Sequence, residues 1–218
     1  MEKIKNNIEK IRSKLPYEVI LVGVTKNRSI AEIEAVIKSG VMDLGENRVQ
    51  EFKEKYEHLP KGIKWHLIGH LQKNKVKYVV GKVFLIHSVD SVDLAKALDR
   101  ESNKKQVVTD ILIQINVSKE ESKYGLDPED LPEALKEIST LENIRVKGLM
   151  TIAPNTENID VLKDIFATTR AIYDKIKENV KEYANVEMTY LSMGMTNDFE
   201  LAVEAGSNMV RIGSGLFE

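Results

Sequence analysis

Short apolar segments and amphipathic segments alternate eight times along this chain, and this alternation limits the possible folds more than any other feature. The apolar segments are typical of buried strands, and residues 111–117 form the clearest of them. The amphipathic segments show the 3.6-residue period of helices, and several end at glycine. We expect strands at residues 19–24, 41–44, 64–68, 83–86, 111–117, 144–150, 186–191 and 208–212, and helices at 4–15, 29–40, 49–56, 71–80, 92–101, 128–141, 159–176 and 197–204.

Regular alternation of strand and helix implies a parallel sheet. Eight such units within 218 residues fit a compact (β/α)8 TIM barrel with an extra N-terminal helix. No Gly/Ser/Pro-rich linker divides the chain, so we expect residues 1–218 to form a single domain. The alternative is an open doubly wound sheet. It is disfavoured because no G-x-G-x-x-G follows the first strand, and because polar residues follow many strands rather than one switch point.

Composition narrows the classes of partner. Acidic and basic residues nearly balance, 34 against 32, so no overall field attracts nucleic acid or an anionic membrane, and small molecules are the expected partners. The absence of cysteine excludes disulfides, thiolate nucleophiles and thiolate zinc sites. The N-terminal residues predict a helix rather than a signal sequence, and no apolar run approaches the roughly 20 residues of a membrane span. We expect a cytoplasmic protein.

Lys26 stands directly after the first expected strand. Five of the six residues 19–24 are apolar, so this strand is expected to be buried on both faces. The carboxyl end of a barrel strand is where such folds place their chemistry. A desolvated lysine there would be a nucleophilic amine that forms Schiff bases with carbonyl compounds such as pyridoxal phosphate. The alternative is a strand-end lysine whose stem covers apolar surface while its ammonium reaches water.

Two loops near the C-terminus combine glycines with hydroxyl groups. Residues 192–196 (SMGMT) follow the seventh expected strand, and residues 211–215 (RIGSG) lie at the end of the eighth. Glycine backbone N–H groups and hydroxyls suit a phosphate, and these two loops are the usual phosphate site of such barrels. Either loop alone could be a tight turn. Together with Lys26 they favour a phosphorylated ligand.

Three further patterns carry less weight. Residues 40–45 have the glycine spacing of a P-loop, but Glu46-Asn47 stands where Lys-Ser/Thr is required. His66 and His70 lack the H-E-x-x-H context of a zinc site, so we predict no metal and interpret His66 as a hydrogen-bonded histidine at the rim. The lysine-rich segment 61–82 is interpreted as a solvated face rather than an anion or RNA patch, and no nucleic-acid partner is expected.

Six segments carry a resemblance to a known family. They are VGVTK (22–26), GENRVQE (45–51), WHLIGHLQKNK (65–75), GLM (148–150), SMGM (192–195) and VRIG (210–213). The chain resembles, along nearly its whole length, the pyridoxal phosphate homeostasis proteins, which are single-domain relatives of the alanine racemase N-terminal barrel. Two departures are that Thr196-Asn197 replaces the more usual Ser-Asp, and that the chain stops slightly short of the family's usual end.

The resemblance implies a cofactor and its ligands. Lys26 would hold pyridoxal 5'-phosphate as a covalent Schiff base, and Arg211 would face the pyridine nitrogen. The phosphate would be bound by Ser192, Gly213 and Ser214, with the hydroxyl of Thr196 also available. Asn47 and Met150 would line the pocket.

The same resemblance bears on catalysis. A guanidinium only donates hydrogen bonds, so Arg211 would keep the ring nitrogen unprotonated and make the ring a poorer electron sink. Racemases on this barrel have a second domain with a catalytic tyrosine, and only three residues follow Gly215 here. We therefore expect a monomeric carrier of pyridoxal phosphate in vitamin B6 homeostasis, without significant catalysis, whose partners include amino acids and PLP-dependent apo-enzymes. The alternatives are a racemase-type PLP enzyme and a cofactor-free Schiff-base enzyme of the aldolase type.

Overall fold

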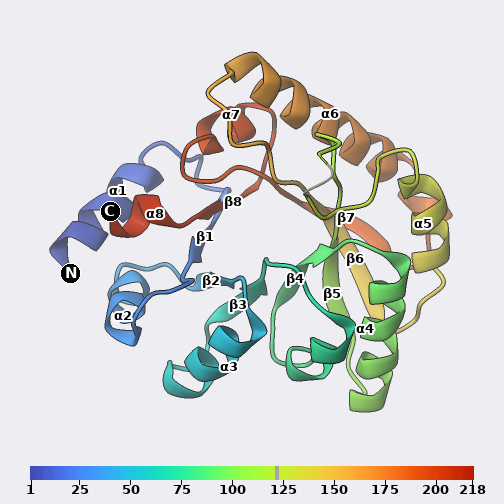
Figure 1. The fold of residues 1–218 in the computed structure, drawn as a ribbon, viewed down its shortest axis with the longest axis horizontal. Helices are drawn as coiled ribbons and strands as arrows, with labels where there is room; N and C mark the ends of the chain where they lie inside the picture. Colours follow the sequence, from blue (N-terminus) through green and yellow to red (C-terminus); the bar gives the residue numbers. More distant parts are fainter. Residues whose placement is uncertain (121–122) are drawn as a thin grey trace.

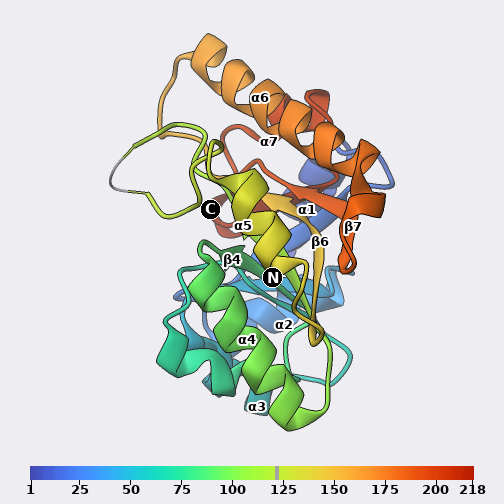
Figure 2. The ribbon, with the colours of Figure 1, turned by 90° about the vertical axis from the view of Figure 1, so that its right-hand side faces the viewer.

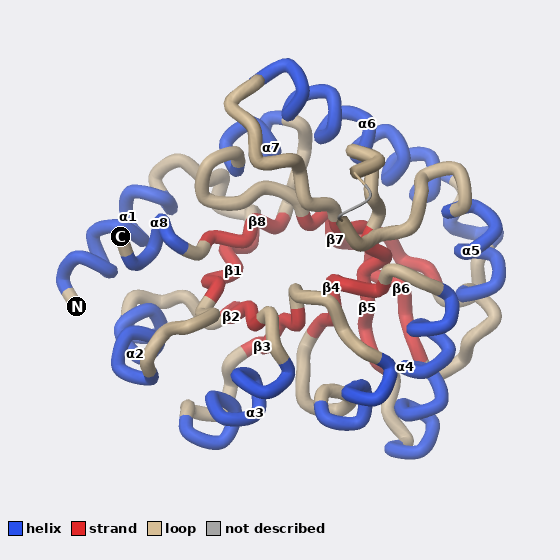
Figure 3. Tube along the Cα trace, in the orientation of Figure 1, coloured by secondary structure: helices blue, strands red, loops and turns tan. Residues whose placement is uncertain are grey.

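Eight parallel strands close into a barrel in the order in which they occur along the chain, and helices surround it (Figures 1 and 3). The computed structural model describes residues 1–120 and 123–218. The strands are β1 Ile20–Val24, β2 Asp43–Glu46, β3 Lys64–Leu67, β4 Leu85–Val89, β5 Thr109–Gln114, β6 Ile144–Met150, β7 Val186–Ser192 and β8 Met209–Ile212. The predicted (β/α)8 barrel is confirmed.

The helices lie on the outside of the barrel, and Figure 2 shows α4, α5 and α6 covering one side of it. Their bounds are α1 Glu2–Arg12, α2 Ile30–Lys38, α3 Val49–His58, α4 Val92–Lys105, α5 Leu131–Ile138, α6 Ile159–Glu178, α7 Phe199–Glu204 and α8 Ser214–Phe217, with 3-10 helices η1 Lys73–Tyr78 and η2 Val180–Glu182. The N-terminal α1 is the extra helix predicted, and it packs beside α8. In the described residues, none of these helices has both the length and the apolarity to cross a bilayer.

Pairing between β1 and β8 closes the barrel. β1 pairs with β2 through Gly23 and Leu44, and with β8 through Val22 and Arg211. Because all neighbouring strands are parallel, their carboxyl ends meet at one rim. The residues that follow the strands are therefore brought to the same end of the barrel.

Several local predictions differ from the structure. The expected helix 71–80 is the 3-10 helix η1, in which Lys75 N donates to Gln72 O at 2.9 Å and Val79 N donates to Val76 O at 3.1 Å. Strand β5 ends at Gln114 instead of residue 117, because Gln114 O accepts from Leu126 N of the following loop at 2.8 Å. Helix α5 begins at Leu131, since Asp127 instead forms a turn in which its O accepts from Asp130 N at 3.0 Å.

Gly148 allows β6 and β7 to approach each other. Its φ is 147°, and a Cβ built on it would lie 1.7 Å from Tyr190 O of β7. Only glycine fits at this position, because every other residue would add the clash and a strained backbone.

Apolar side chains fill two regions. The larger lies between the barrel and its helices, and the smaller lies inside the barrel, formed by Val22, Leu85, Leu112, Met150 and Met209. Polar side chains are also buried, among them His66 of β3, His87 of β4, Ser192 of β7 and Arg211 of β8.

Candidate functional site at the carboxyl rim of the barrel

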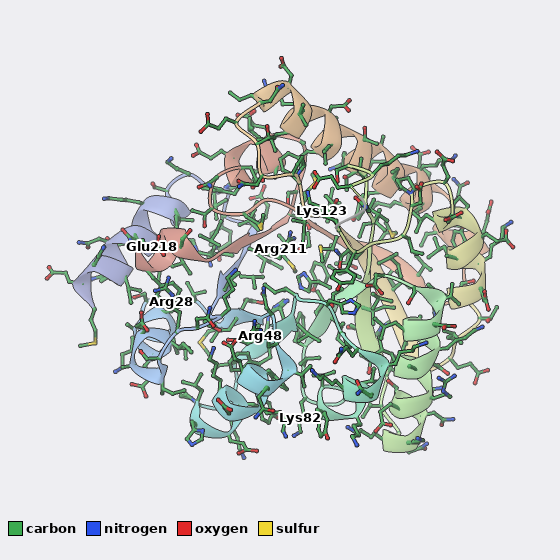
Figure 4. The ribbon with its side chains drawn as sticks, viewed as in Figure 1. Arg28, Arg48, Lys82, Lys123, Arg211 and Glu218 are labelled. Carbon is green, nitrogen blue, oxygen red and sulfur yellow. The ribbon has the colours of Figure 1, made fainter. Side chains whose placement is uncertain are left out.

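The predicted site residues come from the carboxyl ends of five strands. Lys26 follows β1, Asn47 follows β2 and Met150 ends β6. Ser192 ends β7 and Arg211 lies near the end of β8. Figure 4 shows Arg211 near the middle of the view down the barrel, whereas Arg28 and Glu218 lie at its periphery. The fold thus brings residues from across the chain to one rim.

Lys26 is exposed, in a turn that begins after the buried Thr25. The expected burial of strand β1 is confirmed, but the interpretation of Lys26 as a desolvated amine is wrong, because burial stops one residue earlier. Helix α3 fixes this turn on both sides. Lys55 Nζ donates to Thr25 O at 2.7 Å, and Asn27 N donates to Glu51 Oε2 at 2.8 Å. The amine is therefore accessible and is carried on a turn that two hydrogen bonds join to α3.

A buried ion pair lies beneath this turn. Lys55 Nζ is 2.6 Å from Glu46 Oε1 and 3.1 Å from Glu51 Oε2, and Thr25 Oγ1 also donates to Glu46. Burial raises the pKa of Glu46, while the hydrogen bonds from Lys55 and Thr25 act in the opposite direction. The other oxygen, Oε2, has no hydrogen-bond partner among residues 1–120 and 123–218.

Sequence reasoning did not find Lys55. The signal was present, because Val49, Phe52 and Lys55 recur every three residues on the buried side of α3. A lysine in an apolar helical stripe indicates a buried cation with a nearby anion.

Arg211 is almost fully buried and uses both ends of its guanidinium. One terminal nitrogen donates to Ser192 Oγ at 2.7 Å, and the other donates to Thr151 O at 2.9 Å. Burial lowers the pKa of Arg211 to about 10, with the charge of Asp198 opposing the shift. Arg211 therefore remains a cation at neutral pH, with further N–H groups available to a ligand.

Ser192 lies with Arg211 and His87 rather than in the loop that follows it. Its Oγ accepts from Arg211 and lies 3.0 Å from His87 Nδ1, and the residue is completely buried. The structure therefore joins Ser192 to Arg211 and His87, and among residues 1–120 and 123–218 no hydrogen bond links it to Thr196 or Ser214.

Those other hydroxyls do come together. Thr196 Oγ1 accepts from Gly215 N at 3.3 Å and from Ser214 Oγ at 3.3 Å. Gly215 permits this contact, because a Cβ built on it would lie 2.9 Å from Thr196 Cγ2. Gly213 directly precedes Ser214, so the loops after β7 and β8 present Thr196, Gly213 and Ser214 as one group of donors.

Asn47 and Met150 flank the site at different depths. Asn47 is half-buried, and its backbone is so close to Gly69 that a Cβ there would lie 2.2 Å from Asn47 O. Met150 is buried in the inner apolar cluster of the barrel. Asn47 therefore lies at the rim and Met150 below it.

The two histidines considered as metal ligands diverge. His66 lies inside the barrel, where its Nε2 is 3.1 Å from Asp43 Oδ1, so its expected place at the rim is wrong. The reason is that strand alternation points its side chain inward. His70 is exposed and bonds to Asp90 Oδ2 at 3.0 Å. The pair does not converge on a common point.

The lysine-rich segment borders a surface cavity of about 280 Å³ between η1 and α4. Lys73 and Lys77 line it together with Arg100 and Lys104, and Lys73 is paired with Asp93 at 2.9 Å. This cavity lies away from the residues of the rim site.

Comparisons with known proteins agree with this fold. Residues 1–218 match the family model of the alanine racemase N-terminal domain. A pyridoxal phosphate homeostasis protein from Aquifex aeolicus is 44% identical over 198 residues, covering 90% of this chain and 85% of that protein. A protein of the same name from Escherichia coli is 32% identical, covering 100% of this chain and 97% of its own length.

Solved structures give the same result. PipY of Synechococcus elongatus, in a structure with PLP bound, superposes with a TM-score of 0.90 at 35% identity, covering 99% of this chain and 100% of that one. Alanine racemase of Clostridium difficile shares the fold, with a TM-score of 0.82 at 16% identity, and this chain covers 59% of it. By the family model, by identity over nearly the full length and by fold, this chain belongs to the alanine racemase N-terminal domain family and, within it, to the pyridoxal phosphate homeostasis proteins.

Proposed function

We propose that residues 1–218 act as one domain that binds pyridoxal 5'-phosphate covalently through Lys26 and serves its homeostasis, without significant catalysis. The donor set of the rim carries this proposal. An accessible amine at Lys26, a buried guanidinium at Arg211 and the hydroxyls of Thr196 and Ser214 match the aldehyde, the ring nitrogen and the phosphate of that compound. The names of the relatives and the PLP-bound PipY structure support it.

Each residue has a separate task in this proposal. Bound pyridoxal phosphate supplies an aldehyde that condenses reversibly with primary amines and a ring that accepts electrons. Lys26 presents its amine on the turn fixed by Lys55 and Glu51. Thr196, Gly213 and Ser214 hold the phosphate, and Asn47 and Met150 line the pocket. Ser192, also predicted to bind phosphate, is assigned here to the orientation of Arg211, from which its Oγ accepts a hydrogen bond.

Arg211 is the reason for proposing little catalysis. Its pKa of about 10 keeps it protonated at neutral pH, so it would donate a hydrogen bond to the ring nitrogen. Unlike an aspartate at this position, it cannot accept a hydrogen bond from a protonated ring nitrogen. A ring whose nitrogen stays unprotonated withdraws electrons weakly. Exchange of the aldehyde between amines needs no such withdrawal. Amino acids and PLP-dependent apo-enzymes are therefore the proposed acceptors, and we propose that the protein is monomeric.

The test is to add pyridoxal phosphate to the purified protein, record the visible absorption before and after borohydride, and map the modified peptide by mass spectrometry. We expect a yellow band that reduction fixes on Lys26. The variant Lys26→Ala should lose the band, and Lys38→Ala, at an exposed lysine of α2, should keep it. Labelling spread over surface lysines would contradict the proposal.

A second experiment separates a carrier from a racemase-type enzyme. The loaded protein is incubated with L-amino acids in deuterated water, and exchange at the α-carbon is followed by NMR. A carrier gives a rate no higher than that of free pyridoxal phosphate. Faster exchange would make the protein an enzyme.

A further inference from the structure

A chain of hydrogen bonds crosses the inside of the barrel, from Arg211 near the carboxyl rim to Asp43 at the opposite end. Its first bond runs from Arg211 to Ser192 Oγ at 2.7 Å, and its second joins Ser192 Oγ and His87 Nδ1 at 3.0 Å. His87 Nε2 is then 2.8 Å from His66 Nδ1, and His66 Nε2 is 3.1 Å from Asp43 Oδ1. Asp43 is the first residue of β2, so this polar chain spans the barrel along its strands.

The two ends of this chain together fix the direction of its bonds. The carboxylate of Asp43 only accepts and therefore requires a proton on His66 Nε2, while the guanidinium of Arg211 only donates to Ser192 Oγ. With His66 Nδ1 left as an acceptor, His87 Nδ1 must accept as well, so Ser192 turns its own hydrogen toward His87 Nδ1. His87 must then carry its proton on Nε2 and donate to His66 Nδ1. His66 in turn carries its proton on Nε2 and donates to the carboxylate of Asp43. Both histidines are neutral, and reversal of any one bond would leave two donors or two acceptors facing each other.

The residues of this chain of hydrogen bonds are buried, so water does not replace their hydrogen-bond partners. His66, His87, Ser192 and Arg211 are each no more than 3% exposed. Burial lowers the pKa of His66 and lowers that of His87 well below its ordinary value, which agrees with two neutral rings. Within residues 1–120 and 123–218, Arg211 has no carboxylate at ion-pair distance. On the side of the guanidinium that faces this chain of hydrogen bonds, the polar group that contacts Arg211 is therefore the Ser192 hydroxyl.

We propose that His87, His66 and Asp43 are positioning residues which, through Ser192, fix the orientation of the Arg211 guanidinium toward its ligand. This inference rests on the proposed function, since the ligand in question is the pyridine nitrogen of pyridoxal phosphate. The carboxylate of Asp43 anchors the far end, where it fixes the proton of His66 on Nε2. Each ring then fixes the next, and Ser192 holds its oxygen toward Arg211.

Asp43 is the best position to test. It lines a cavity of about 550 Å³ at the amino-terminal end of the barrel, together with Arg12, Tyr17 and the start of β1. A change there cannot touch a ligand at the carboxyl rim. Any effect on such a ligand must pass through the barrel.

The experiment compares Asp43→Asn with Asp110→Asn. Asp110 is a matched control, because it also lies near the start of its strand, its side chain is also 21% exposed, and it pairs with Arg145 at 2.9 Å instead of joining the chain. Affinity for pyridoxal phosphate is measured by absorption titration. We expect Asp43→Asn to weaken binding by about tenfold, the loss of roughly one well-oriented charged hydrogen bond, and Asp110→Asn to leave it unchanged.

Coupling and proton positions distinguish positioning from general destabilisation. Ser192→Ala cuts the chain next to Arg211, so in that background Asp43→Asn should have no further effect on affinity. In the ligand-free protein, ¹⁵N NMR of the histidine side chains should show the proton of both His66 and His87 on Nε2, with His66 perturbed by Asp43→Asn. If Asp43→Asn does not fold, the positioning role is tested by the affinity of Ser192→Ala for pyridoxal phosphate and by the histidine tautomers of the wild-type protein.

The outcomes separate the two proposals. Failure of the wild-type protein to bind pyridoxal phosphate overturns the proposed function and the positioning role with it. Normal wild-type binding that Asp43→Asn or Ser192→Ala leaves unchanged overturns the positioning role alone. A proton on Nδ1 of His66 or His87 would contradict the proposed direction of the hydrogen bonds from Arg211 to Asp43.

Discussion

The Nζ atom of Lys55 lies 2.7 Å from the carbonyl oxygen of Thr25, the residue before Lys26, and 2.6 Å from Oε1 of Glu46. One buried ammonium therefore holds the end of β1 against β2 and α3. The two charges are buried together, so each depends on the other for its stability.

Lys55→Met should destabilise the fold by about 3–5 kcal/mol, because it leaves Glu46 as a buried carboxylate without its cation. The measurement is the free energy of unfolding from urea titration. Lys38→Met, at a lysine whose side chain is 71% exposed, should change it by less than about 0.5 kcal/mol. The double variant Lys55→Met with Glu46→Gln should recover part of the loss. A single-variant loss as small as that of Lys38→Met would contradict the role given to Lys55.

Thr196→Val should weaken binding of pyridoxal phosphate by about tenfold, through loss of one hydrogen bond to a charged group. Binding of pyridoxal, which has no phosphate, should be unchanged. The ratio of the two affinities by absorption titration is the measurement. Thr140→Val is the control, because within the described residues that exposed hydroxyl bonds only to Glu137 O of its own turn. An equal loss for both ligands would place Thr196 outside the phosphate site.

The contribution of His66 and His87 to the free energy of unfolding should fall as the pH falls below about 6.5, the ordinary pKa of histidine. Burial lowers the pKa of His66 and His87 in the folded state. Below pH 6.5 the unfolded protein therefore binds protons on these histidines that the folded protein does not bind, and this favours unfolding. Each histidine contributes at most about 1.4 kcal/mol per pH unit. Urea titrations at several pH values test this. His66→Gln should flatten the curve and the exposed His58→Gln should not. A difference between the wild-type and His66→Gln curves that stays constant from pH 6.5 to pH 5 would contradict it.

Gly148→Ala should be among the most damaging single substitutions, since its Cβ would meet the backbone of Tyr190 at 1.7 Å. Gly40→Ala separates this clash from backbone strain. Gly40 also has a positive φ, 85°, but nothing lies within 4 Å of its added Cβ, so a loss of about 1 kcal/mol is expected there. Thermal unfolding of both variants makes the comparison. Equal losses would show that strain alone accounts for Gly148.

The fold could be predicted because its signal is local. Apolar runs and helical periods lie within single segments, and eight repeats of the same unit leave few arrangements open. The predicted boundaries were wrong where a partner from elsewhere decides them. Residue 115 continues the apolar run of β5, but the backbone of Leu126 ends the strand at Gln114.

In the candidate site too, some residues could be predicted from local sequence signals, whereas others depend on partners that are distant in the sequence. The rim residues could be found because strand ends are visible in the sequence. The bond between His87 and Ser192 joins residues 105 positions apart, and no spacing rule connects them. The burial of Lys26 was predicted wrongly because the apolar run indicates the burial of a strand but not the residue at which it stops.

The pairing of Ile20 with Met209 and of Val22 with Arg211 also has a consequence for biosynthesis. Strand β1 leaves the ribosome well before β8, so one of its two edges has no partner until β8 has been translated. During that time an apolar parallel strand has an open edge, which is a site for aggregation. Closure also joins the most distant strands in the sequence, and such contacts form slowly. We therefore expect barrel closure to be a late step that waits for the synthesis of β8, and Arg211 to reach its place only when that step is complete.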